Sequence, residues 1–262
     1  MVISLRQEGE MVEAYQSFAQ VYDLFMKEVP YDEWAEYIEE IWRKFGCDPK
    51  LVAELGCGTG NMTTLFAKKG IEMIGIDVSE DMLSIAREKA LKNNVDILYL
   101  HQDMREFELY GTVDCIISVC DSLNYITDRE GLLQTFKWVN NYLNPKGLFI
   151  FDLNTEYKYK YILGENTFAE NLDEAAYIWD NYYSEEDGIN EYQLTLFIKQ
   201  PEKDYYSKFE EIHYERMYSI EDIKSLVEEA GMEFLAVYDA YTFEDPKENS
   251  DRIYFVVREK GK

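Results

Sequence analysis

The chain has 262 residues, 47% of them hydrophobic, which is enough for one α/β domain that carries an insertion. Lys and Arg number 26 against 52 Asp and Glu, so the formal net charge is −26 at pH 7. Nucleic acids and anionic membranes are held mainly by cationic side chains, and this balance argues against both as partners.

The four cysteines, Cys47, Cys57, Cys115 and Cys120, form neither a C-x-x-C pair nor the spacing of a metal site. No uninterrupted apolar run approaches the ~20 residues of a membrane helix, and the N-terminus does not resemble a cleavable signal. We therefore expect reduced thiols, no metal and a cytoplasmic location.

Two amphipathic helices are predicted ahead of the first strand. Apolar residues recur there at steps of three and four, in the sets Met11, Tyr15, Phe18, Tyr22, Phe25 and Trp34, Ile38, Ile41, Phe45. We expect residues 1–47 to form a helical cover over the ends of the strands.

A glycine-rich turn follows the first predicted strand, near residues 50 to 55. Gly56, Gly58 and Gly60 occupy alternate positions, as is typical of a backbone that closely approaches a ligand. A nicotinamide or flavin enzyme uses G-x-G-x-x-G to hold a pyrophosphate, but here Asn61 stands where that motif has its third glycine. Glu54 would also repel a pyrophosphate, whereas it suits a ligand that carries an ammonium group.

Strands and helices then alternate. Strands are predicted at 71–77, 97–100, 113–119 and 148–151, with Ser79 capping one helix and a capping box at 127–130 starting another. This alternation predicts a Rossmann-like α/β fold with a mostly parallel sheet covered on both faces.

The region 156–218 has a different residue pattern, because aromatic residues alternate there with polar ones. We predict an inserted antiparallel β meander that forms the acceptor side of a pocket. Ser219 to Asp222 caps a further helix, and strands near 233–239 and 252–258 end the chain. The core would then comprise 48–155 and 219–262.

Four motifs in order resemble those of class I S-adenosylmethionine-dependent methyltransferases. They are Glu54-x-Gly56-x-Gly58-x-Gly60, Ile76-Asp77-Val78-Ser79 with Met82, His101-Gln-Asp103-Met104 and the segment Asp114 to Tyr125. The opening Tyr15-x-x-Phe18-Ala-x-x-Tyr22-Asp23 and the phrase Cys120-Asp-Ser-Leu-Asn124-Tyr resemble the bacterial YqeM-type branch. The resemblance implies a seven-stranded sheet with a reversed final hairpin, and S-adenosylmethionine as cofactor.

The resemblance also implies a set of cofactor contacts. Asp77 would accept both ribose hydroxyls, although a helix-capping role is the alternative. Asp103, with the Met104 backbone, would bind the adenine edge, unless Asp103 is an ordinary loop acid. The remaining expected contacts are Glu54, Gly56, Cys57, Gly58, Gly60, Val78 and Met82 along the loop and the next helix, and Cys120 and Ser122 at the methionine end.

Tyr15 and Tyr22 lie seven residues apart on one helix face. Their rings would attract the sulfonium by a cation–π interaction, or would simply belong to the core, and the sequence does not distinguish these interpretations.

The acceptor side is less specific. Asn124 and Arg216 are candidate substrate contacts, and capping of a turn is an equal alternative for Asn124. His213 shares a strand face with Glu215 and is the candidate general base. The alternative is a histidine at the sheet surface that is bonded to a tyrosine or an acid.

These patterns predict a methyltransferase (class 2.1.1) that moves a methyl group to an O or N nucleophile of a small molecule by in-line displacement. The chain lacks the Asn- or Asp-Pro-Pro-Tyr motif of enzymes that methylate amino groups of nucleic-acid bases. We expect a monomer or a homodimer. Two other classes stay open, namely a non-catalytic S-adenosylmethionine-binding or interaction module and a nicotinamide-dependent oxidoreductase.

Overall fold

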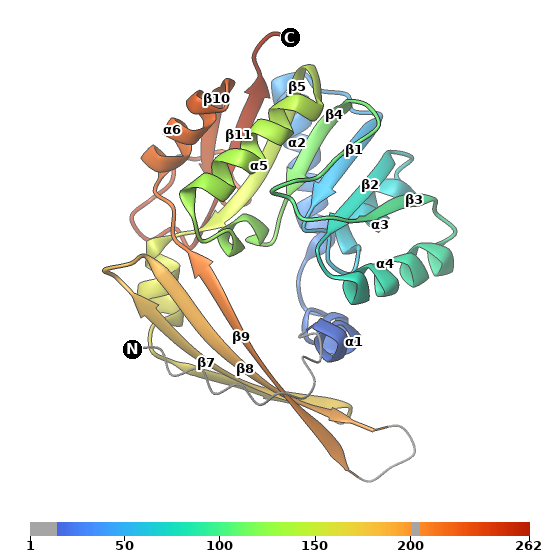
Figure 1. Ribbon diagram of the computed structural model, residues 1–262, viewed down its shortest axis with the longest axis vertical. Helices are drawn as coiled ribbons and strands as arrows, with labels where there is room; N and C mark the ends of the chain where they lie inside the picture. Colours follow the sequence, from blue (N-terminus) through green and yellow to red (C-terminus); the bar gives the residue numbers. More distant parts are fainter. Residues whose placement is uncertain (1–14, 201–204) are drawn as a thin grey trace.

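The computed structural model describes residues 15–200 and 205–262, except for the side chains of 15–18 and 20, and contains two separate sheets. The larger sheet has seven strands in the order β10-β11-β5-β4-β1-β2-β3 (Figure 1). Their bounds are β1 Leu51–Leu55, β2 Glu72–Asp77, β3 Ile97–His101, β4 Val113–Ser118, β5 Leu143–Asn154, β10 Met232–Asp239 and β11 Arg252–Glu259. β11 is antiparallel to both neighbours, so the predicted sheet with a reversed final hairpin is confirmed.

Helices cover both faces of this sheet, because the strands are apolar on both sides. One face packs against α5 (Arg129–Tyr142) and α6 (Ile220–Glu229), and the other against α2 (Tyr31–Phe45) and α3 (Asn61–Lys68). α4 (Glu80–Asn93) contacts α3 and β3. The carboxyl ends of β1, β2 and β4 are left accessible at one edge, where open α/β sheets bind ligands.

Local signals set most helix starts. The Ser79 hydroxyl accepts from the backbone N of Met82, and Ser219 and Asp222 form the predicted capping box of α6. The predicted box at 127–130 was wrong by one residue, because Asp128 caps α5 and accepts from the backbone N of Gly131 at 2.7 Å. A carboxylate is the better acceptor for an exposed N–H, which accounts for the shift.

Strand β5 begins at Leu143 and ends at Asn154, so it is longer at both ends than the predicted strand at 148–151. Its pairing with β4 is irregular, since Val113 faces Leu143 whereas Cys115 faces Leu148. Lys146, at φ 65°, accommodates the extra residues as a local bulge.

The smaller sheet is an antiparallel meander of four strands, β6 (Thr167–Asn171), β7 (Ala175–Ser184), β8 (Ile189–Lys199) and β9 (Tyr206–Arg216). It follows the short helix η2 (Lys158–Leu163) and projects away from the core (Figure 1). α1 (Tyr15–Phe25) lies between the two parts, with Val21 packed among Leu194, Leu196 and Ile198. Within the described residues no helix has the length and apolar character that a membrane crossing requires.

Candidate active site

A cavity of about 200 Å³ lies over the carboxyl ends of β1, β2 and β4. α1 and the start of α2 close it from the side of the meander. It brings together most of the residues that the sequence singled out. Its lining is Tyr22, Tyr31, Glu54, Gly56, Cys57, Gly58, Thr59, Asn61, Met62, Asp77, Val78, Met82, Met104, Val119, Cys120, Ser122 and Tyr125.

The glycine loop folds back onto β2, since the backbone N–H groups of Gly56 and Cys57 both donate to the carbonyl of Ile76. Gly56 (φ 69°) and Gly58 (φ 52°) adopt the left-handed conformation and line the cavity. A Cβ atom on Gly56 would lie 2.6 Å from the Ser122 side chain. The loop therefore needs glycine both for its turn and for its contact with the segment after β4.

Gly60 has a different role from the predicted one. It does not line the cavity, and a Cβ atom at this position would lie 2.4 Å from the Tyr99 hydroxyl. Tyr99 comes from β3, on the side of the loop away from the cavity. Gly60 thus allows close packing of the loop against β3 rather than a contact with a ligand.

Glu54 is the most unusual polar group of the cavity. Its side chain is 2% exposed, and its Oε2 atom has no hydrogen-bond partner in the described part of the chain. Burial raises the pKa of this carboxyl well above its ordinary value, against the backbone N–H of Thr63, which lowers it. A buried oxygen of this kind calls for a cationic or hydrogen-donating ligand.

Asp77 at the end of β2 organises the loop as well as lining the cavity. One carboxylate oxygen accepts from Gly58 N at 2.7 Å and the other from Ser79 N at 2.8 Å. Burial raises the pKa of Asp77, and these hydrogen bonds oppose the rise. Each oxygen keeps a further lone pair, so both interpretations of Asp77 are compatible with the geometry.

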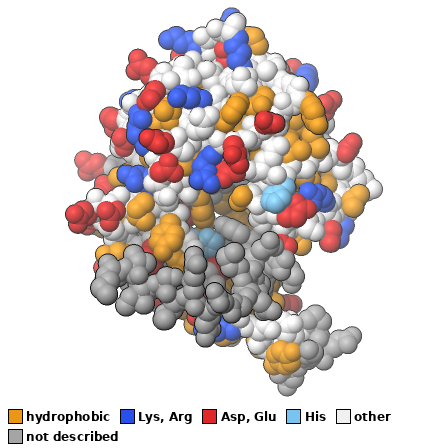
Figure 2. All heavy atoms as spheres, viewed as in Figure 1, with side chains coloured by type: hydrophobic (Ala, Val, Ile, Leu, Met, Phe, Trp, Pro, Cys, Tyr) orange, Lys and Arg blue, Asp and Glu red, His pale blue; other side chains and the backbone are white. Residues whose placement is uncertain are grey.

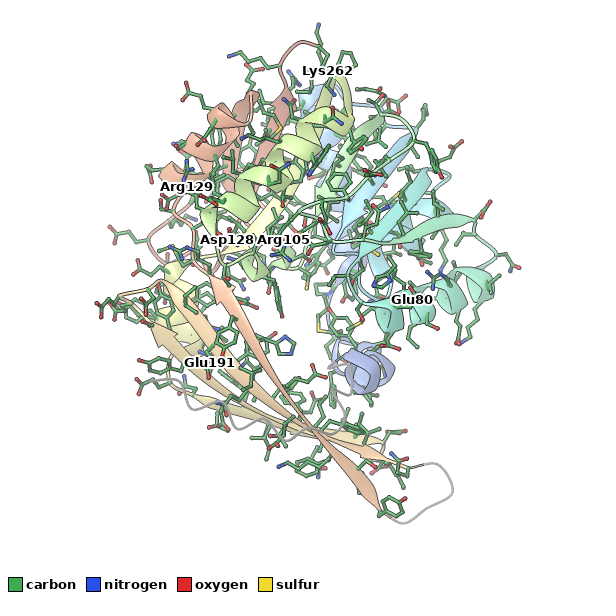
Figure 3. The ribbon with its side chains drawn as sticks, in the orientation of Figure 1. Glu80, Arg105, Asp128, Arg129, Glu191 and Lys262 are labelled. Carbon is green, nitrogen blue, oxygen red and sulfur yellow. The ribbon has the colours of Figure 1, made fainter. Side chains whose placement is uncertain are left out.

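Asp103 departs from the expectation, although its neighbour Met104 lines the cavity. The Asp103 carboxylate lies outside the cavity and is bound by the Arg105 guanidinium, with Nε 3.0 Å from both oxygens. The Arg105 guanidinium holds the pKa of Asp103 below its ordinary value. Figure 3 shows Arg105 on the side of the core where Asp128 lies. This ion pair, and not a ligand, occupies the Asp103 carboxylate here.

The segment after β4 is conformationally unusual. Cys120 (φ 61°) and Asp121 (φ 53°) are consecutive non-glycine residues in the left-handed region, which is often found at functional sites. Arg252 of β11 holds the turn in place by binding Asp121 at 2.6 Å and also the buried Asp152. The strained turn presents Cys120 and Ser122 to the cavity.

The environment of the cavity cysteines disfavours the reactive thiolate. Burial raises the pKa of Cys120 to about 12 and that of Cys57 well above its ordinary value. Both thiols therefore favour the protonated form at neutral pH.

α1 supplies Tyr22 to the cavity, whereas the side chain of Tyr15 lies outside the described residues. The sequence included Asp23 in the opening motif without assigning it a role, and the structure shows that it docks α1 onto the loop. Its carboxylate accepts from the Thr59 hydroxyl at 2.7 Å and from Asn61 Nδ2 at 3.1 Å, and it pairs with Lys89 Nζ at 2.7 Å. The polar pair Tyr22-Asp23 within an otherwise apolar helix face is the sequence feature that could have indicated this role.

Asn124 and Arg216, the candidate substrate residues, do not reach the cavity. Asn124 is fully buried, donates from Nδ2 to the Arg216 carbonyl at 2.7 Å and accepts from Asn154 N at 3.0 Å. The Arg216 guanidinium donates to the Thr127 carbonyl and lies on another part of the surface. Both residues therefore join the meander to the core.

His213 lies on the buried face of β9, as the alternation predicted, together with Glu215. Its Nε2 lies 3.0 Å from a carboxylate oxygen of Glu211. The ring stacks on Tyr192 at 4.7 Å and meets the edge of Tyr125, which lines the cavity. His213 is thus hydrogen-bonded to an acid, and the ring of Tyr125 separates it from the cavity.

Together, the seven-stranded sheet, the glycine loop and the buried acid define a class I methyltransferase architecture, and the comparisons agree. A model of the methyltransferase domain matches residues 52–147. A Geobacillus protein (strain WCH70) is 35% identical over 93% of this chain and 99% of its own length. YqeM of Bacillus subtilis (strain 168) is 34% identical over 92% of this chain and 95% of its own. Both are classed by name with the methyltransferases.

Among solved structures, an S-adenosylmethionine-dependent methyltransferase from Clostridium acetobutylicum ATCC 824 superposes with a TM-score of 0.84. It is 31% identical, and the match covers 94% of this chain and 99% of that one. The chain therefore belongs to the family of S-adenosylmethionine-dependent methyltransferases, and S-adenosylmethionine is its cofactor. The resemblance to the YqeM-type branch is confirmed.

The residues of the cavity fit this cofactor. The unpartnered oxygen of Glu54 matches the ammonium of a methionine moiety, and Gly56 and Gly58 leave the backbone accessible beside it. Asp77 has lone pairs available for hydroxyl groups. Bound there, the cofactor supplies a methyl group activated by a positively charged sulfur.

Proposed function

We propose that the protein transfers the methyl group to a nitrogen or oxygen atom of a small organic molecule by in-line displacement. The observation that carries this proposal is the position of Tyr125. Its ring lines the cavity on one side and contacts His213 of the meander on the other. The cavity and the inserted sheet thus share a wall, so that an acceptor held by the meander meets the cofactor there.

The cofactor contacts that we propose follow from the cavity. Glu54 binds the ammonium, Asp77 the ribose hydroxyls, and Cys120 and Ser122 the methionine end. The rings of Tyr22 and Tyr31, both within the lining, flank the positive sulfur and exclude water. Holding two reactants in attack geometry is worth ~7–11 kcal/mol, so positioning is the main task of these residues.

Charge supports a small acceptor over a nucleic acid. The net charge is −26, and the meander meets α1 with an aromatic and aliphatic face rather than a basic one. Large aromatic walls with polar edges suit a small organic ligand. The oxidoreductase alternative is excluded by the family, whereas a non-catalytic cofactor-binding protein is the competing hypothesis.

His213 is our candidate proton acceptor. A general base typically contributes ~10²–10⁴-fold to the rate, so His213→Gln is expected to lower kcat by roughly 10²-fold without changing cofactor affinity. Full turnover by His213→Ala on an identified acceptor would remove this role.

Two measurements test the proposed function. Calorimetric titration with S-adenosylmethionine should show binding that Asp77→Ala weakens at least ~10-fold, because two hydroxyl contacts are lost. A small-molecule library is then screened for release of S-adenosylhomocysteine. Cofactor binding without release for any small molecule would favour the non-catalytic alternative.

A further inference from the structure

The face of the meander that packs against α1 carries a polar cluster on β9. Glu211 and His213 are 4% and 6% exposed, whereas Ile212 between them points outward and is 55% exposed. The register places His213 opposite Tyr192 of β8, and the rings stack at 4.7 Å. The Trp179 ring of β7 lies 5.0 Å beyond Tyr192. Three strands thus build one aromatic wall that ends in a carboxylate.

Two buried polar atoms on this wall have no hydrogen-bond partner in the described part of the chain. They are Glu211 Oε1, an acceptor, and Trp179 Nε1, a donor. The other Glu211 oxygen is already engaged by His213. Leaving such groups unpaired costs ~1–3 kcal/mol each, and native proteins seldom do so. The pair points to a ligand that donates to Glu211 and accepts from Trp179.

The charge of the cluster favours a cationic donor. Among the described residues, Glu211 forms an ion pair with His213 alone, and no Lys or Arg lies within 4.0 Å of Glu215. Glu215 is instead bound by the Tyr159 hydroxyl at 2.8 Å, and burial, with a contribution from Asp121, raises its pKa to about 8. A further negative group would be repelled here, whereas an ammonium would compensate Glu211.

This cluster borders the cofactor cavity. Tyr125 lines the cavity, its ring meets His213 edge-on at 5.9 Å, and its hydroxyl is hydrogen-bonded to that of Tyr192. The described surface is hollowed at the lower edge of the core (Figure 2).

We propose that the acceptor is a small amine that also carries an oxygen near its nitrogen, and that Glu211 selects the amine over a hydroxyl. The inference rests on the proposed function. The ammonium donates to Glu211 Oε1 while its neighbouring oxygen accepts from Trp179 Nε1. One N–H bond then breaks, its electron pair stays on nitrogen, and the proton passes to the Glu211–His213 pair.

The rest of the step balances. The electron pair on nitrogen forms a bond to the methyl carbon while the carbon–sulfur bond breaks. The electrons of the broken bond remain on sulfur. The products are S-adenosylhomocysteine and a methylated ammonium, and the proton leaves to solvent. A hydroxyl acceptor would bring no positive charge to Glu211 and would bind less tightly.

A matched pair of probes tests the selection, namely 2-amino-1-phenylethanol and 1-phenyl-1,2-ethanediol. They are titrated by calorimetry with S-adenosylhomocysteine present, so that no turnover occurs. The wild type should bind the amine at least ~10-fold more tightly than the diol, as expected for a charged hydrogen bond. Glu211→Gln should abolish this preference.

Two further variants serve as controls. Glu210→Gln, on the outer face where Glu210 is bound by Lys208, should keep the full preference for the amine. Trp179→Phe keeps a ring but removes the N–H, so it should weaken both ligands alike. Thermal unfolding and cofactor titration show whether each variant is folded.

The proposal is overturned if the diol binds as tightly as the amine, or if Glu211→Gln keeps the preference. It is also overturned if no amine binds from a library of amines, each matched to the corresponding alcohol. The proposed function fails separately. Methyl transfer to alcohols alone would overturn the proposal of an amine acceptor but support the proposed function. Binding of amines without any methyl transfer would overturn the proposed function.

Discussion

Glu54 is expected to favour ligand binding while it lowers the stability of the ligand-free protein. Its carboxyl is buried with one oxygen unpaired, and burial raises its pKa well above the ordinary value. Above that raised pKa the folded protein must hold an uncompensated charge, which lowers its stability. Binding of an ammonium removes this penalty.

Glu54→Gln is therefore expected to have two opposite effects. Cofactor affinity should fall by roughly 10- to 100-fold, because a charge-assisted hydrogen bond is lost. The ligand-free protein should become more stable, and the gain should be larger at pH 8 than at pH 5, because a raised pKa means that the folded wild type is destabilised as its carboxyl loses the proton. Calorimetry and urea unfolding at the two pH values check both effects. Equal stability of the two proteins at pH 8 would contradict this account of Glu54.

Arg252 is a second residue with a predictable energetic role. It binds the carboxylates of the half-buried Asp121 and the fully buried Asp152 and thereby fixes the turn that carries Cys120. Arg252→Ala leaves both carboxylates without a counter-charge, which should cost roughly 3–5 kcal/mol at neutral pH. Without the arginine the pKa values of both acids rise, so the loss should shrink as the pH falls. Urea unfolding of both proteins from pH 5 to pH 8 measures it, and a loss independent of pH would contradict this role.

At the scale of elements, α1 is held on the glycine loop by one carboxylate. Asp23 bonds to Thr59 and Asn61 of the loop and pairs with Lys89 of α4. The same helix carries Tyr22 into the cavity. The position of α1 and the occupancy of the cavity should therefore be coupled.

Asp23→Ala is expected to weaken cofactor binding about 5- to 10-fold, chiefly through faster dissociation, because α1 opens more readily. Global stability should change little, since the core of the sheet does not depend on this contact. Stopped-flow dissociation and thermal unfolding test this. Glu36→Ala, which changes an exposed acid on α2, is the control. An equal effect in both variants would show that Asp23 does not hold α1 on the glycine loop.

The elements were largely predictable because local signals specify them. Period-two and continuous apolar runs indicated the strands, and Ser79 and Ser219 marked helix starts by a hydrogen bond to a nearby backbone N–H. The site was less predictable where contacts are long-range. Asn124 carries suitable chemistry, but the backbone of Asn154, from another strand, engages it. No spacing in the sequence announces such partners.

At the scale of the whole molecule, we propose that the core binds the cofactor and that the insertion selects the substrate. The seven-stranded sheet supplies a cofactor cavity, and the meander adds a buried face on which Glu211 Oε1 and Trp179 Nε1 have no hydrogen-bond partner among the described residues. The negative net charge fits this division, since it repels polyanions and tolerates a cationic acceptor. We therefore place substrate selection in the meander.

The most direct test of a small-molecule methyltransferase follows the labelled methyl group itself. The protein and labelled S-adenosylmethionine are incubated in parallel with a small-molecule extract, total RNA and a protein extract. The account predicts label in at least one small molecule, with one S-adenosylhomocysteine released per methyl group transferred. Label that enters only RNA or protein would contradict it.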